Sequence, residues 1–265
     1  MSDLLCQWAS DFSAETWGKI KLAHNSKYFK IYETTITQNM IYESIVNDFG
    51  KISIQEAVDE SRNGNDLEVF IKVGSKYKRF AVQAKISYRT EKYKSISHRG
   101  NSGLCQIFDL VLYAKREKAI PLYFLYTYSK GYLEDIKING SLACEYGVSV
   151  INAHTIFWNY FNSSENKFKK IPSVSDLIER DDLYTFSEFL CNKKCLNKLE
   201  RSIFNPVGKL PDTKEIKAIN YDYDESFLDD DNWMNIDSKS HTQKYSTSIN
   251  NDTGFNPGHR IIIDT

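Results

Sequence analysis

The sequence predicts an α/β fold in which helices cover a mixed β-sheet. Two periodicities and one long apolar run support this prediction. Apolar residues recur at helical spacing in three segments, which are residues 2–22, about 35–48 and 103–118. Apolar and polar residues alternate, as in half-buried strands, in three others, which are residues 51–58, 66–73 and 79–86. The continuous apolar and aromatic run at 120–128 predicts a buried central strand.

Turn residues and composition divide the chain further. Polar clusters at 60–65 and 74–78 separate the three alternating segments, so we expect an antiparallel meander. Farther along, a strand is predicted at 147–154 and one or two helices at 173–203. We expect an α/β domain at residues 1–165, a helical extension at 166–205 and an acidic, largely irregular tail at 206–265 that could pack back on the core. The last residues, "HRIIIDT", either add a strand or stay irregular.

Charge is distributed unevenly along the 265 residues. Residues 206–265 hold six Lys and Arg against eleven Asp and Glu, a net charge of −5. The chain totals of 34 basic and 35 acidic residues leave 28 and 24 for residues 1–205, a net charge of +4. A mildly basic body permits nucleic-acid binding without requiring it. The acidic tail could shield that basic body by mimicking DNA.

The five cysteines and the apolar segments indicate a cytoplasmic protein. The number of cysteines is odd and none has zinc-ligand spacing, so we expect reduced thiols. Cys191 and Cys195 are four residues apart on a predicted helix, without a second cysteine or histidine pair nearby. No apolar run approaches the roughly 18 residues of a membrane span, and the first residues lack the basic start of a signal peptide. We therefore expect no contact with a membrane.

Polar side chains interrupt the third alternating segment, "RFAVQAKI". Gln83 and Lys85 are two residues apart, so both project from the same face of a strand. If the segments 66–73 and 79–86 form a hairpin, Asp66 lies close to this pair. A carboxylate, an amide oxygen and an ammonium then converge, a set that suits Mg²⁺ and charge stabilisation at a phosphate.

At these residues the chain resembles the PD-(D/E)XK nuclease superfamily, which has the restriction-endonuclease-like fold. The resemblance is carried by "GND" (64–66), by "QAK" (83–85) and by the order helix, three strands, helix, strand. It covers about residues 30–130. The segments "ETTITQN" (33–39) and "QIFDLVLYAKREKAIPLYFLY" look similar to an uncharacterised bacterial family of such proteins. The resemblance implies a nuclease-like domain at residues 1–165.

The resemblance also implies a role for each matching residue. Asp66 would be the principal ligand of Mg²⁺ or Mn²⁺, Lys85 the catalytic lysine, and Glu33 an acid that contacts the metal directly or through water. Gln83 stands where the superfamily usually has Asp or Glu, which leaves room for a weak, metal-selective or inactive site. Gln106 on the next helix would position the substrate or the lysine. Tyr113 is a second candidate there, although its spacing from Gln106 is longer than usual.

Other residues compete with these or extend them. Glu43 is the rival acid on the helix of Glu33, about 80° around that helix. Glu68 shares the strand face of Asp66, and we interpret it as a solvated residue. The polar loop at 87–102 interleaves tyrosines with basic residues, which suits phosphate contact and base stacking, although a plain solvated loop is equally common. Its candidates for nucleic-acid binding are Arg89, Lys92, Lys94 and Arg99, with Tyr88 and Tyr93 as aromatic neighbours.

The resulting hypothesis is a metal-dependent DNA endonuclease, and the resemblance implies a setting in bacterial antiviral defence or a mobile element. The alternative is a nucleic-acid or protein-binding module on the same scaffold, with weak or no catalysis. A third reading is a nuclease that a partner switches on. We expect DNA as the partner, with a protein partner or a second copy of the chain left open.

Overall fold

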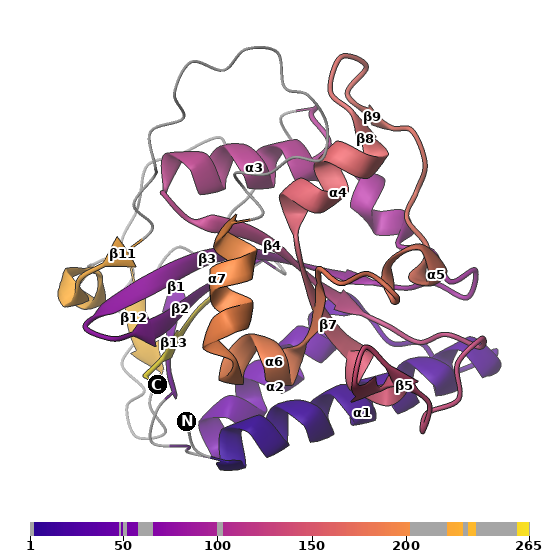
Figure 1. Ribbon diagram of the computed structural model, residues 1–265, viewed down its shortest axis with the longest axis horizontal. Coiled ribbons are helices and arrows are strands. Elements are labelled where there is room, and N and C mark those ends of the chain that lie inside the picture. The colour runs from indigo at the N-terminus through magenta and orange to yellow at the C-terminus, as the bar shows by residue number, and fades with distance from the viewer. Residues whose placement is uncertain are drawn as a thin grey trace.

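The computed structural model describes residues 3–47, 49, 52–57, 66–99, 103–201, 222–229, 233–236 and 259–264. Within these residues, nine strands form one mixed sheet in the order β10-β7-β4-β3-β2-β13-β1-β12, with β11 paired to β3 (Figure 1). The strand bounds are β1 Ile52–Ala57, β2 Asp66–Val73, β3 Lys76–Ile86, β4 Ile120–Tyr126, β7 Val148–Asn152, β10 Leu183–Thr185, β11 Asp222–Tyr223, β12 Trp233–Ile236 and β13 His259–Ile263. The predicted α/β class, a mixed sheet flanked by helices, is confirmed.

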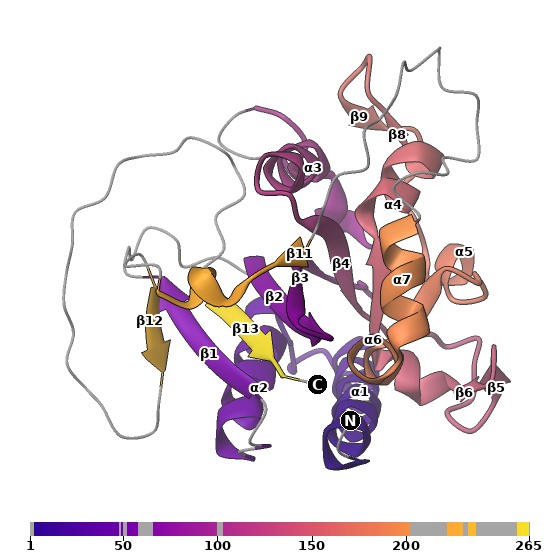
Figure 2. The same ribbon diagram turned by 60° about the vertical axis from the view of Figure 1, so that its left-hand side comes forward.

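Helices cover both faces of the sheet. One face carries α3 (Gln106–Arg116) and α4 (Ala153–Tyr160), and the other carries α1 (Asp3–Asn25), α2 (Glu33–Val46) and α6 (Phe186–Cys191) (Figures 1 and 2). Shorter elements complete the described chain: α5 Val174–Leu177, α7 Lys193–Arg201, the 3-10 helices η2 Lys94–Ser97, η3 Ala143–Gly147 and η4 Glu225–Asp229, and two hairpins, β5 Lys137–Ile138 with β6 Ser141–Leu142 and β8 Phe161–Asn162 with β9 Lys167–Phe168. The three helices predicted in the first 118 residues correspond to α1, α2 and α3.

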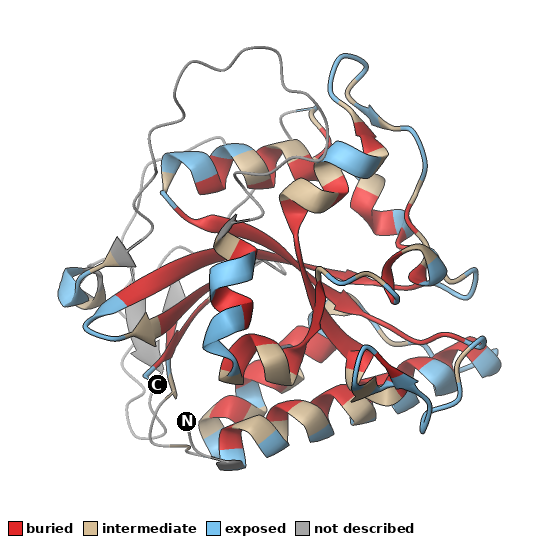
Figure 3. Cartoon of the chain, in the orientation of Figure 1, coloured by how far each residue is buried: buried red, intermediate tan, exposed pale blue. Residues whose placement is uncertain are grey.

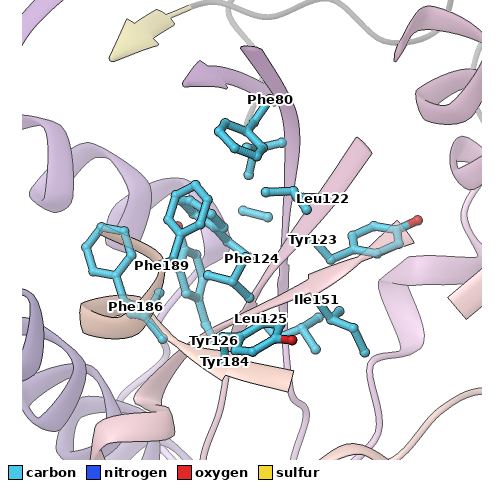
Figure 4. Packing of buried hydrophobic residues seen from close by; sticks show 14 of the residues in the cluster. Phe80, Leu122, Tyr123, Phe124, Leu125, Tyr126, Ile151, Tyr184, Phe186 and Phe189 are labelled. Carbon is cyan, nitrogen blue, oxygen red and sulfur yellow. The ribbon is translucent and has the colours of Figure 1, made fainter. Parts of the chain in front are cut away.

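The core lies between the central strands and these two helical layers. Every residue of β4 is buried, and β3 is buried from its second residue to its last (Figure 3). On one face, the ring of Phe124 lies 5.6 Å from the rings of both Phe186 and Phe189 of α6. Tyr123 points to the opposite side of the strand (Figure 4). The aromatic run at 120–128 is therefore a central strand buried on both faces, as predicted.

The predicted antiparallel meander is wrong in one of its two pairings. β2 and β3 form the expected antiparallel hairpin, but β13 lies between β1 and β2. β13 pairs parallel with β2 and antiparallel with β1. The three isoleucines of β13, at positions 261–263, are all buried. A strand in the interior of the sheet is covered on both faces, which suits a segment whose consecutive residues are apolar. The last residues of the sequence thus add a strand, the alternative that local pattern left open.

Segments after residue 165 belong to the same core. β10 forms one edge of the sheet, and Leu183, Phe189 and Leu199 join the hydrophobic cluster that contains β4. The described parts of the predicted irregular tail are β11, η4, β12 and β13. The turn cluster at 60–65 and the rest of the tail lie outside the described residues. The predicted shielding of the basic body by the tail therefore stays a prediction.

The cysteines do not all remain thiols. Cys6 of α1 and Cys191 of α6 form a disulfide, with their Cα atoms 5.9 Å apart. This Cα separation is ordinary for a disulfide, but the two cysteines are 185 residues apart in sequence, so no local pattern predicted the bond. Cys105, Cys144 and Cys195 are free. The expectation of five reduced thiols is therefore wrong, because packing of α6 against α1 brings two of them together.

The position of α1 matters for the site described below, because its last turn forms part of a cleft. The helix packs closely on η3, where a Cβ added to Gly147 would lie 1.8 Å from the carbonyl oxygen of Ser13. Only a residue without a side chain allows this approach. Neither α1 nor any other helix among the described residues is long and apolar enough to cross a membrane.

Candidate functional site

The β2–β3 hairpin sets the positions of three predicted site residues. Its two-residue turn places Gly74 at a φ of +70°, a conformation that glycine adopts readily. From the pair Val73 and Lys76 at the turn, the register runs to Asp66 opposite Gln83. Lys85 follows two residues later on β3, on the same face as Gln83. The hairpin therefore brings the three positions together as the sequence predicted.

Lys85 is held by residues from two other elements. Its Nζ donates to Oε1 of Gln106, the first residue of α3, at 2.9 Å. The same nitrogen lies 4.0 Å from Oε2 of Glu33, the first residue of α2. The Lys85 side chain is 5% exposed. An ammonium group at this depth requires polar and oppositely charged neighbours, and Gln106 and Glu33 supply them.

Glu33 is anchored by its other oxygen. Oε1 accepts hydrogen bonds from the backbone N–H of Ile86 at 3.0 Å and from the hydroxyl of Ser95 at 2.5 Å. A carboxylate is also favourable at the start of a helix, where the dipole is positive. These contacts fix the carboxylate while Oε2 faces Lys85. Ser95 was not predicted, because a single serine in a polar loop carries no spacing or motif that distinguishes it.

These residues open onto a cleft of about 800 Å³. Its walls come from the last turn of α1, the α1–α2 loop, the start of α2, the end of β3 and the loop after β3. Among the described residues that line it, one is acidic, Glu33, and five are basic: Lys27, Lys30, Lys85, Arg89 and Lys94. Such an excess of positive charge within a concave surface attracts anions, phosphate groups among them.

The four residues predicted to bind nucleic acid divide into two pairs. Arg89 and Lys94 line the cleft, whereas Lys92 and Arg99 do not. Arg99 donates instead to the carbonyl oxygens of Gly103 and Asn166, and the backbone of Lys92 pairs with Ser173. Lys92 and Arg99 are exposed outside the cleft, so their predicted role in nucleic-acid binding stays a prediction.

The aromatic neighbours of that loop also differ. Tyr88 is 42% exposed and lines the cleft. Tyr93 is buried, and its hydroxyl lies 2.7 Å from the hydroxyl of Thr127. Because it is enclosed in the core, Tyr93 is not accessible to a base, and its predicted stacking role is wrong.

Three side chains were predicted to hold a metal ion, and the structure describes two of them, Glu33 and Gln83. Asp66 is placed by its backbone pairing, and its side chain lies outside what the structure describes. Among the described residues, no three His, Cys, Asp or Glu side chains gather as a metal-binding group. Glu33 contributes one carboxylate oxygen that faces Lys85, and Gln83 is buried opposite Asp66. A metal at this place would therefore depend on Asp66.

Tyr113 does not join Gln106 at the cleft. Its hydroxyl donates to Oε1 of Glu68 at 2.7 Å, beneath the far part of α3. Seven residues along a helix return to nearly the same side but lie about 10 Å farther along the axis. Gln106 therefore reaches Lys85, whereas Tyr113 reaches a different cluster. The prediction that Tyr113 positions substrate is wrong for this reason.

That second cluster is built around Glu68, which is fully buried rather than solvated as predicted. Arg79 of β3 donates from Nε to Glu68 Oε1 at 2.7 Å, and Arg260 of β13 donates from Nε to Oε2 at 2.8 Å. Burial, reinforced by the charge of Glu68, raises the pKa of Tyr113 well above its usual range, so this hydroxyl stays a donor. Glu68 is enclosed by Tyr113 from α3 and by Arg260 from β13, and local sequence does not reveal the pairing that brings β13 beside its strand.

Glu43, the rival acid of α2, lies away from the cleft lining. Its Oε2 accepts a hydrogen bond from the indole nitrogen of Trp8 at 3.0 Å. Glu33 is thus the acid of α2 that faces Lys85.

His24 is a buried residue of the cleft wall that the sequence did not single out. Its Nε2–H donates to the carbonyl oxygen of Ser87 at 3.0 Å, and its ring meets Tyr128 edge to face. Burial lowers the pKa of His24, although the hydrogen bond to Ser87 opposes this effect. The ring is therefore neutral near pH 7 and adds no charge to the cleft.

The sequence was compared with families, curated proteins and solved structures. A family model, DUF6615, described as a family of unknown function, matches residues 5–253. Neither the comparison with curated proteins nor the comparison with solved structures found a match.

Proposed function

The chain belongs to the DUF6615 family, and since its description assigns no activity, we propose a function from the site itself. We propose a metal-dependent nuclease that hydrolyses phosphodiester bonds in DNA. The observation that carries this proposal is the buried Lys85, held by Gln106 and Glu33 at the wall of a cationic cleft. A lysine in such a place can reach a bound phosphate without being surrounded by bulk water.

The proposed metal is Mg²⁺ or Mn²⁺, with Asp66 as the principal ligand and Glu33 and Gln83 as further oxygen donors. Carboxylate and amide oxygens are the donors that these hard cations prefer. When bound, the ion supplies Lewis-acid activation of a phosphoryl oxygen and of a water molecule. The donor types fit this role, and the opposition of Asp66 and Gln83 across the hairpin supports it.

The remaining residues bind and orient. The ammonium of Lys85 stabilises the negative charge that develops on the phosphate oxygens. Gln106 orients that ammonium through its 2.9 Å hydrogen bond, and the backbone N–H of Gln106 is itself fixed by the carbonyl oxygen of His98. Lys94 and Arg89 hold neighbouring phosphates at the rim of the cleft.

One observation favours a second function, a DNA-binding module with little catalysis. Gln83 replaces a carboxylate in the position opposite Asp66, and a neutral amide is a weaker ligand for Mg²⁺ than a charged oxygen. In that case the cleft would bind DNA without cutting it. A cytoplasmic role in antiviral defence, on DNA alone or with a protein partner, remains part of the proposal under either function.

Metal binding separates the two functions. We expect Mn²⁺ to bind the wild-type protein in isothermal titration calorimetry and to support plasmid nicking that EDTA abolishes. Asp66→Ala should lose both properties, because it removes the principal carboxylate. Asp135→Ala, which removes an exposed carboxylate outside the cleft lining, is the matched control and should keep both. Nicking that persists in Asp66→Ala would contradict the nuclease proposal, and binding of DNA without metal or nicking would favour the binding module.

A further inference from the structure

The α1–α2 loop, residues 26–32, forms a wall of the cleft that the predicted site did not include. It places two large aromatic side chains at the surface, Phe29 at 39% exposed and Tyr32 at 61%. Both line the cleft, as does Tyr88 from the loop after β3. Within the described part of the chain, none of these three rings packs on another aromatic ring. Three accessible rings therefore surround one concave, positively charged surface.

The α1–α2 loop is held in place by its own hydrogen bonds and by Arg89 from the loop after β3. The hydroxyl of Ser26 accepts from the backbone N–H groups of Tyr28 and Phe29, at 3.1 and 3.0 Å. Nη2 of Arg89 donates to the carbonyl oxygens of Ala23 and Ser26, which ties the loop after β3 to the end of α1. Because these contacts fix the backbone, the rings are presented on a prearranged support rather than on a free segment.

Cations alternate with these rings. Lys27 and Lys30 lie on the same loop as Phe29 and Tyr32, and Lys94 lies across the cleft. Aromatic rings that stack bases, combined with cations that follow the phosphate backbone, are the features that bind single strands without sequence preference. In a duplex, by contrast, neighbouring bases cover each π-face, so the rings would find no free base to contact.

The volume of the cleft agrees with a single strand. About 800 Å³ falls within the roughly 300–1,000 Å³ of pockets that enclose a drug-sized molecule, so part of a strand fits inside. Lys85 lines the same cleft as the three rings, so a strand stacked on the rings would be able to present a phosphate to that ammonium.

We propose that the cleft binds single-stranded DNA, with bases stacked on Phe29, Tyr32 and Tyr88 and phosphates paired with Lys27, Lys30 and Lys94. This inference deepens the proposed nuclease function and rests on it for the cleavage step, since it names the single strand as the substrate.

Equilibrium binding in EDTA tests the proposal without any contribution from metal or cleavage. The probe is a fluorescein-labelled 12-nucleotide dT strand, measured by anisotropy against the same strand annealed to dA and against a uridine RNA strand. We expect the single DNA strand to bind at least tenfold more tightly than the duplex. Tyr32→Ala, Phe29→Ala and Tyr88→Ala should each weaken that binding about tenfold, since each loses one stacking platform. Lys30→Ala should lower the slope of log affinity against log salt by about 0.7.

Tyr28→Ala is the matched control. Tyr28 lies on the same loop and is 96% exposed, but it does not line the cleft. Its loss should leave affinity unchanged, which separates stacking in the cleft from a general effect of exposed tyrosines.

The results distinguish this inference from the nuclease proposal. Equal or tighter binding of the duplex or the RNA strand, or wild-type affinity in all three ring variants, would overturn the single-stranded DNA inference even if metal-dependent nicking is observed. Ring-dependent binding of the single strand without any cleavage would uphold the binding site and overturn the nuclease function.

Discussion

Arg79 and Lys85 lie six residues apart on β3 and on the same face of the sheet, yet their surroundings differ. Arg79 belongs to what we term the closed cluster, with Glu68, Tyr113 and Arg260, which is buried under α3 and joined to the C-terminal strand. Lys85 belongs to the open cluster, with Glu33 and Gln106, which adjoins the 800 Å³ cleft. Two cationic side chains of one strand thus have different neighbours.

The difference separates a cationic side chain enclosed in the interior from one that borders a cleft. In the closed cluster, both oxygens of Glu68 accept direct hydrogen bonds from arginines, and Glu117 adds a second carboxylate 3.4 Å from Arg79. In the open cluster, Lys85 and the nearest oxygen of Glu33 are 4.0 Å apart, and solvent or a ligand can enter beside them. We infer that the closed cluster holds β13 in the sheet, whereas the open cluster is the one to which the proposed function assigns the chemistry.

The largest expected effect on stability comes from the closed cluster. Glu68→Gln should lower the free energy of unfolding by about 3–5 kcal/mol, because it removes the buried carboxylate that Arg79 and Arg260 share. Urea denaturation followed by circular dichroism measures this change. Glu33→Gln, the matched variant in the open cluster, should cost less than about 2 kcal/mol, since the amide oxygen still accepts from Ile86 and Ser95. Equal losses in the two variants would remove the distinction between the clusters.

Two residues of α3 sharpen the comparison. Gln106→Ala should lower the DNA-cleavage rate about tenfold, because it frees the ammonium of Lys85 from its orienting hydrogen bond. It should cost less than about 1 kcal/mol of stability, because Lys85 borders the cleft and water there can replace the lost acceptor. Tyr113→Phe should do the reverse, costing about 1–3 kcal/mol of stability while cleavage stays at the wild-type rate. A cleavage defect in Tyr113→Phe at temperatures where the variant is folded would show that the two clusters are coupled.

The smallest expected effect is a pH dependence at the wall of the cleft. Burial lowers the pKa of His24 from its usual 6.5, so the unfolded chain binds a proton there more readily than the native chain. His24 therefore contributes stability above about pH 6.5 that is lost as pH falls toward its native pKa. We expect His24→Gln to flatten the decrease in urea midpoint between pH 7 and pH 5. Asn25→Gln, at the exposed last residue of α1, changes no titratable group and should leave the decrease unchanged.

Local pattern predicted the strand part of the open cluster. The alternation in "RFAVQAKI" placed Gln83 and Lys85 on one face, and a two-residue turn fixed Asp66 opposite Gln83. Glu33 and Gln106 were predicted through the family resemblance instead, and in the structure each is the first residue of its helix and lies beside Lys85.

The closed cluster could not be predicted in this way. Arg260 is 192 residues from Glu68 in sequence, and only the parallel pairing of β13 with β2 brings them together. Without that strand, Glu68 has the spacing of a solvated residue. The prediction for Tyr113 was wrong because helical spacing predicts which face of the helix a residue occupies. It does not predict which part of the sheet that residue contacts. The Cys6–Cys191 disulfide depends likewise on contacts between distant elements, and so does the place of the aromatic α1–α2 loop in the cleft lining.

The rate at which single-stranded DNA is cut in Mg²⁺ tests the central claim most directly, when wild type is compared with Lys85→Ala under single-turnover conditions. Lys76→Ala, which removes an exposed lysine at the other end of the same strand, is the matched control. We expect Lys85→Ala to lose at least about 100-fold in rate, because one preorganised charge-stabilising group is removed, and Lys76→Ala to match wild type. Equal rates for wild type and Lys85→Ala would contradict the account.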